Sequence, residues 1–216
     1  MRTLTDAAHP GRPAATRIVM LPAAYSSAED FVREGFASAV RARGLDIDLV
    51  FTPLQLEHVT DRSVLGRVHR EIVQPARAQH AAVWLGGISL GAYIALCYAA
   101  EHARELAGLC LFAPYLGSHI ITGEIERAGG ARAWDAGAVA ADDEERRVWR
   151  FIKQRPAALA LHLGLGREDR FAPRHRLLAQ VLPAQAVDCV PGGHDWPTWG
   201  RLWENFLDAR FAHGHG

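Results

Sequence analysis

Short apolar runs alternate with stretches of helical spacing along most of this chain. In a helical stretch the apolar residues recur about every three to four positions, whereas a buried strand is a short continuous apolar run. Strands that alternate with helices form parallel sheets covered on both faces, so the pattern predicts an α/β domain. The runs predicted as strands are residues 17–21, 46–51, 81–85, 108–112, 158–164 and 186–190.

The helical stretches carry recognisable end signals. Gly44 marks the end of the first stretch, Pro75 should end or kink the second, and Asp195 is suited to cap the last. The spacing predicts helices over residues 27–43, 61–79, 90–106 and 196–211.

Two segments depart from this alternation. Residues 1–16 are rich in Ala, Pro, Arg and Thr, which predicts a flexible leader before a single domain over residues 17–216. A chain of 216 residues with 49% hydrophobic content can bury one full core. In about 116–155, glycines separate short helical pieces, which is typical of a lid inserted after a strand. The apolar side chains there either line a pocket or dock the lid onto the core: Ile120, Ile121, Trp134, Val148 and Trp149.

A serine lies between two glycines where the third apolar run gives way to a helical pattern. In Gly86-Gly87-Ile88-Ser89-Leu90-Gly91, Ser89 takes the turn between the strand and the helix. A serine in a strained positive-φ conformation leaves no room for Cβ atoms nearby, which explains Gly87 and Gly91. The pattern predicts a nucleophile elbow, with an ordinary turn serine as the alternative.

A serine nucleophile needs a base and an orienting carboxylate, and later strand ends supply both. Asp169 follows the fifth run within Gly166 to Pro173, a frame that favours it over Glu168. His194 follows the last run in Gly-Gly-His. Parallel strands end at one edge of the sheet, so the three side chains should meet there. The other histidines, including His162 and His175, are expected to be structural or exposed.

These motifs and their order resemble those of the α/β-hydrolase superfamily, over nearly all of residues 17–211. The resemblance implies an α/β-hydrolase fold with Ser89 as nucleophile, Asp169 as acid and His194 as base. The family's two leading antiparallel strands have no counterpart among the runs above, so a mainly parallel sheet of six strands is expected.

The family also forms an oxyanion hole from two backbone N–H groups, one directly after the nucleophile and one after the first strand. The resemblance assigns these to Leu90 and Ala24, with Tyr25 as the alternative to Ala24. Tyr25 and Trp196 are candidates for the substrate pocket. Trp196, Trp199 and Trp203 recur at helical spacing, which indicates core packing more than a ligand platform.

The expected activity is hydrolysis of carboxylic esters with small or medium acyl groups through an acyl-enzyme on Ser89. Thioesterase or small-amide peptidase activity is the alternative within the enzymes, because pocket shape decides the leaving group. A non-catalytic binding protein of the same fold is the alternative outside them. The presence of a serine, an aspartate and a histidine in family order argues against that reading.

The composition limits the classes of binding partner and cofactor that the sequence predicts. The 24 basic and 24 acidic residues balance, so nothing predicts nucleic-acid binding. Cys97, Cys110 and Cys189 lie in apolar patterns and lack ligand spacing, so they are expected to be buried thiols in a reducing, cytoplasmic setting. No apolar run reaches the length of a membrane span or resembles a signal peptide. The sequence contains no metal, nucleotide or flavin motif, so we expect no cofactor. His213 and His215 are the weak candidates for a metal site. The sequence pattern does not address the oligomeric state.

Overall fold

The computed structural model describes residues 2–54 and 63–211, and in this part of the chain the sheet has seven strands. Their order across the sheet is β1-β3-β2-β4-β5-β6-β7; β1 runs antiparallel to β3 and every other neighbouring pair is parallel. The strands are β1 (Leu4–Asp6), β2 (Thr16–Leu21), β3 (Ile47–Phe51), β4 (Ala82–Ile88), β5 (Gly108–Phe112), β6 (Ala160–Gly166) and β7 (Val187–Val190).

The extra strand lies in the segment that we expected to be a flexible leader, so both the leader and the count of six strands were wrong. The buried carboxylate of Asp48 on β3 anchors this segment: it accepts hydrogen bonds from the N–H groups of Ala8 (3.0 Å) and Ala14 (3.2 Å) and from Arg17. Strand β1 has only three residues of mixed polarity, so the sequence carries no detectable periodicity there.

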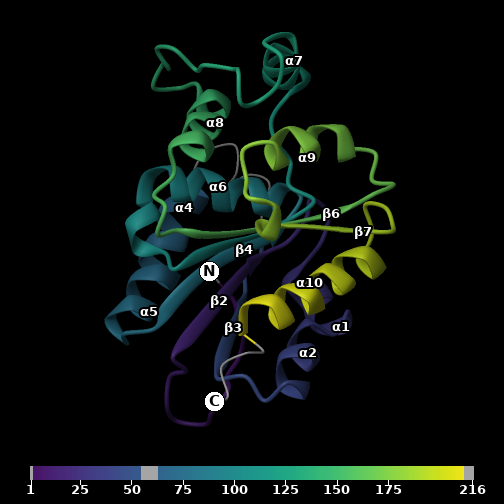
Figure 1. The fold of residues 1–216 in the computed structure, drawn as a ribbon. Coiled ribbons are helices and arrows are strands. Elements are labelled where there is room, and N and C mark those ends of the chain that lie inside the picture. The colour runs from purple at the N-terminus through teal and green to yellow at the C-terminus, as the bar shows by residue number, and fades with distance from the viewer. Residues whose placement is uncertain (1, 55–62, 212–216) are drawn as a thin grey trace.

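Helices cover both faces of the sheet, as the alternation predicted (Figure 1). One face carries α1 (Ala28–Arg33), α2 (Phe36–Ala42) and α10 (Trp196–Phe211). The other carries α4 (Ser63–Val68), α5 (Gln74–Ala78), α6 (Leu90–His102), α8 (Glu144–Gln154) and α9 (Ala172–Ala179). In residues 2–54 and 63–211, none of the helices combines the length and the apolarity that crossing a bilayer requires.

Two of the predicted helices differ in detail from those in the structure. The stretch 27–43 forms two helices, because Gly35 adopts a left-handed conformation (φ 83°) between them. In the stretch 61–79, of which 61 and 62 lie outside the described residues, a π-helical turn, His69–Val73, joins α4 to α5 just before Pro75. The wider turn accommodates the proline ring and its missing N–H, so helical structure continues past the position where we expected an end or a kink.

The insertion at 116–155 contributes α7 (His119–Arg127) and α8. Trp149 is fully buried and its indole N–H donates to the Leu116 carbonyl (3.0 Å). Trp134 is also buried and donates to the carboxylate of Glu124 (2.9 Å). Four of the five apolar side chains considered above lie in the hydrophobic core on this face, whereas Ile120 is exposed. They therefore dock the insertion onto the domain.

Candidate active site

Ser89 occupies the sharp turn between β4 and α6 and has a φ of 52°, which L-residues rarely adopt. Its N–H donates to the Phe112 carbonyl at the end of β5 (2.9 Å). Its carbonyl accepts from the N–H groups of Tyr93 (3.1 Å) and Tyr115 (3.0 Å). Three backbone hydrogen bonds thus hold the strained residue in place.

The glycines on either side are required by close backbone approach, as the sequence predicted. A Cβ on Gly87 would lie 2.6 Å from the carbonyl carbon of Gly91 and 2.7 Å from the Leu21 oxygen. A Cβ on Gly91 would lie 2.2 Å from the same Leu21 oxygen. The start of α6 is therefore packed directly against the end of β2.

Asp169 and His194 come together from the ends of the last two strands. The imidazole Nδ1 of His194 lies 2.7 Å from Oδ2 of Asp169. The neighbouring Glu168 is exposed and accepts instead from the N–H of Gly192, so of the two carboxylates it is that of Asp169 which contacts His194.

The environment keeps Asp169 ionised although the residue is buried. Burial raises the pKa of its carboxyl, but hydrogen bonds from His194 and from the Phe171 N–H (2.8 Å) outweigh that effect, so the pKa is lower than usual. An ionised carboxylate only accepts hydrogen bonds, which places the proton of His194 on Nδ1. The lone pair of His194 is then on Nε2.

Aromatic edges fix the plane of the His194 ring. Phe171 packs against it at 5.2 Å between centroids and 80° between planes, and Trp199 at 5.1 Å and 89°. The carboxylate of the next residue, Asp195, binds elsewhere: it accepts from the N–H (3.0 Å) and hydroxyl (2.7 Å) of Thr198. Asp195 therefore caps α10, as predicted.

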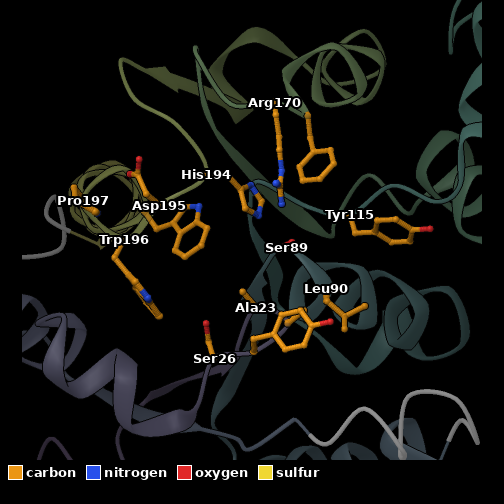
Figure 2. A pocket seen from close by; sticks show the side chains of 14 residues that line it. Ala23, Ser26, Ser89, Leu90, Tyr115, Arg170, His194, Asp195, Trp196 and Pro197 are labelled. Atoms are coloured by element: carbon orange, nitrogen blue, oxygen red, sulfur yellow. The ribbon is translucent and has the colours of Figure 1, made fainter.

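Ser89 and His194 line one cavity of about 690 Å³ (Figure 2). Leu90, Ala24, Tyr25 and Trp196, the other site residues considered above, line it too, and Tyr25 is 97% exposed. None of the lining residues comes from 116–155, and the role of this insertion as a lid stays a prediction. The remaining lining residues are Ala23, Ser26, Tyr115, Arg170, Phe171, Asp195, Pro197 and Trp199.

The sequence did not single out Tyr115, Arg170, Phe171 or Trp199 as lining residues. Tyr115 follows β5 closely, and Arg170 and Phe171 follow Asp169 directly, so their places at strand ends were an available signal. The side chain of Arg170 extends toward the interior of the cavity (Figure 2), and its guanidinium lies 4.8 Å from the Phe171 centroid.

Two other histidines are buried away from the cavity lining. Nε2 of His175 donates to the Pro114 carbonyl (3.1 Å), and burial lowers its pKa to about 4. Burial likewise lowers the pKa of His162 to about 4, and neither of its ring nitrogens has a hydrogen-bond partner among residues 2–54 and 63–211. Both are neutral core residues at neutral pH, in agreement with the structural role predicted for them.

No protein-family model matches the sequence, and no curated protein sequence does either. Solved structures are similar over nearly the whole chain. A ferulic acid esterase has a TM-score of 0.61 at 11% identity, with 95% of this chain and 96% of that chain covered. A monoacylglycerol lipase from Paleococcus ferrophilus has a TM-score of 0.60 at 12% identity, with 100% and 99% covered.

An α/β-hydrolase enzyme from a sediment metagenome of the Mar Chica lagoon has a TM-score of 0.57 at 16% identity, with 96% of this chain and 94% of that chain covered. At these identities the likeness concerns the backbone. Together with the sheet order and the turn at Ser89, it shows that this chain has the α/β-hydrolase fold.

Proposed function

We propose that the protein hydrolyses carboxylic esters with small or medium acyl groups through an acyl-enzyme on Ser89. The observation that carries the proposal is the 2.7 Å contact between His194 Nδ1 and Asp169 Oδ2, in a cavity that Ser89 and His194 both line. A serine, a histidine and a buried carboxylate in this arrangement are the parts that acyl transfer requires.

In the proposed mechanism, Nε2 of His194 takes the proton of the Ser89 hydroxyl as Oγ attacks the ester carbonyl. The carbonyl π electrons move to oxygen and form the tetrahedral oxyanion. The protonated His194, stabilised by Asp169, then gives its proton to the leaving alcohol as the C–O bond breaks. Water repeats both steps on the acyl-enzyme and releases the acid.

Backbone N–H groups of Leu90 and Ala24 would hold the oxyanion. Leu90 is the first residue of α6, and the first N–H groups of a helix have no acceptor within it. Ala24 lies in the turn closed by the hydrogen bond from Ser26 N–H to Ala23 carbonyl (3.1 Å). Tyr25 follows it with a φ of 64°, which matches the third position of a type II turn.

The cavity supports the choice of acyl group. Its volume of about 690 Å³ suits a small organic substrate. Tyr115, Phe171, Trp196 and Trp199 present mostly apolar surface, which favours an aliphatic or aromatic acyl chain over a strongly hydrated one.

A fluorophosphonate probe followed by intact-mass spectrometry and peptide mapping tests the nucleophile. We expect one adduct, on Ser89, and none in Ser89→Ala. The same pair is then assayed with esters of increasing acyl length and with the matching thioester and amide. Faster ester hydrolysis supports the proposal, and a preference for the thioester or amide reassigns the leaving group. A folded protein that neither reacts nor turns over any acyl substrate overturns it in favour of a binding protein.

A further inference from the structure

A second cluster of chemically competent side chains lies at the other end of the helix that begins after Ser89. His102 is the last residue of α6, and Glu105 ends the short 3-10 turn that follows it, η2 (Ala103–Glu105). His69 begins the π-helical turn on the neighbouring segment. Helix α6 has 13 residues, so the cluster lies roughly 20 Å along the helix from the nucleophile. It is separate from the cavity described above.

The three side chains converge on a small volume. Nδ1 of His69 lies 3.2 Å from one oxygen of Glu105, and Nδ1 of His102 lies 3.4 Å from the other. One candidate ligand atom from each residue lies within 4.8 Å of the other two. A tetrahedral zinc ion with bonds of about 2.0–2.1 Å spaces its ligands by about 3.3–3.4 Å. The two nitrogen–oxygen separations are close to this spacing, although they run to different oxygens of Glu105, so a small shift of the carboxylate would bring one oxygen to both nitrogens.

A buried tyrosine orients the carboxylate of this cluster. The hydroxyl of buried Tyr98 donates to Glu105 (3.0 Å) and lies 3.0 Å from Nδ1 of His69, so it orients the carboxylate as an outer-shell partner would. The rings of His69 and His102 stack at 4.5 Å between centroids and 18° between planes, so one ring must turn about its Cβ–Cγ bond before the in-plane lone pairs of both rings reach one ion. The three side chains remain 21–29% exposed, which leaves an ion a route from solvent.

The donor set also selects the class of ion. Two imidazoles and one carboxylate suit zinc and related transition metals, whereas calcium and magnesium prefer oxygen ligands throughout. The π-helical turn, which also accommodates Pro75, is of a kind that occurs frequently at functional sites.

We propose that His69, His102 and Glu105 bind one divalent transition-metal ion of the zinc class, with water completing the tetrahedron. The ion would join the π-helical turn at 69–73 to the end of α6. Such a site binds the folded chain better than the unfolded one, because residues 69 and 102 are brought together only by folding.

The test uses the full chain carrying Cys189→Ser, His213→Gln and His215→Gln as the parent, because an exposed thiol and tail histidines also bind metals. Zinc binding is measured by equilibrium dialysis and cobalt binding by visible absorption. We expect one equivalent of zinc in the parent, a cobalt spectrum typical of tetrahedral coordination, and a higher unfolding temperature with zinc.

The variants His69→Gln, His102→Gln and Glu105→Gln should each weaken zinc binding at least 100-fold and abolish the temperature shift. Glu105→Gln keeps an acceptor for Tyr98, and metal-free thermal unfolding checks that each variant folds. His119→Gln, at an exposed histidine on α7, is the matched control and should bind zinc like the parent. Absence of stoichiometric binding in the parent, or equal binding in folded His102→Gln and Glu105→Gln, overturns the proposal.

Discussion

Replacing Gly91 by alanine tests the close packing on which the geometry of Ser89 depends. The added Cβ would lie 2.2 Å from the Leu21 oxygen, 2.5 Å from its carbonyl carbon and 2.6 Å from the Pro22 oxygen. These are backbone atoms at the buried end of β2, so no side-chain rotation relieves the contact. Relief requires a backbone shift of about 1 Å between α6 and β2, judged from the usual packing distances.

Two opposing effects determine how much Gly91→Ala changes the free energy of unfolding. Overpacking a core typically costs about 1–3 kcal/mol and sometimes more, whereas alanine gains up to about 1 kcal/mol over glycine in a helix. Because all three close contacts are with backbone atoms, we expect Gly91→Ala to lie at the upper end of the overpacking range. The free energy of unfolding should then fall by about 2–4 kcal/mol. For a chain of this size that lowers the unfolding temperature by roughly 5–15 °C.

Gly123→Ala is the matched control, because Gly123 lies inside α7 and a Cβ there meets nothing within 4 Å. Helix propensity alone then applies and should raise stability by about 0.5–1 kcal/mol. Urea unfolding of both variants measures the two free energies, and fluorophosphonate labelling measures the reactivity of Ser89. If Gly91→Ala unfolds within 1 kcal/mol of the wild type and labels at the same rate, the argument from close packing is refuted.

Three further predictions concern the site and the core. Ala24→Pro keeps the type II turn, because proline suits its second position, but it removes the N–H. In steady-state assays kcat should fall about 10²–10³-fold in this variant, whereas Ala24→Gly should retain most activity. Equal kcat values in the two variants would remove Ala24 from the oxyanion hole. Asp169→Asn should lower kcat/KM by about 10³–10⁴-fold, because an amide can donate to Nδ1 of His194 and favour the wrong tautomer; a loss below tenfold on the best ester would contradict its role. His162 stays neutral in the fold with a pKa of about 4, while the unfolded chain binds this proton near pH 6.5, so stability falls as pH drops from about 6.5 to 4. His162→Leu should reduce that loss by roughly 2–3 kcal/mol, as urea unfolding at pH 7 and pH 4.5 will show, and an unchanged difference between the two pH values would contradict the burial argument.

The sequence predicted the parts of the fold that depend on long apolar runs. The runs at 17–21 and 108–112 gave β2 and β5 almost to the residue, because a buried parallel strand needs apolar side chains on both faces. It did not predict β1, whose pairing depends on Asp48, more than 40 residues away. The stabilising contacts of such an edge strand are tertiary and leave no local pattern.

The same distinction applies to the candidate sites. The candidates Ser89, Asp169 and His194 could be named from the sequence because each lies within a few residues of a strand end, and parallel strands bring their ends to one edge. His69 and His102 are 33 positions apart on different segments, and only the spacing from His102 to Glu105 is local. That cluster became visible once the segment at 69–73 was placed against α6, since a single local histidine–glutamate pair is common on helices.

The constraints on Ser89 also explain how sequence likeness can vanish while the fold is kept. A positive φ at a non-glycine residue costs of order 1–3 kcal/mol, and here three backbone hydrogen bonds and two glycines hold it in place. None of these contacts depends on the side chain of Phe112, Tyr93, Tyr115 or Leu21. The turn at Ser89 therefore sets no requirement on these side chains beyond the order of the strands and the two glycines. Identities of 11–16% alongside TM-scores of 0.57–0.61 are what this arrangement allows.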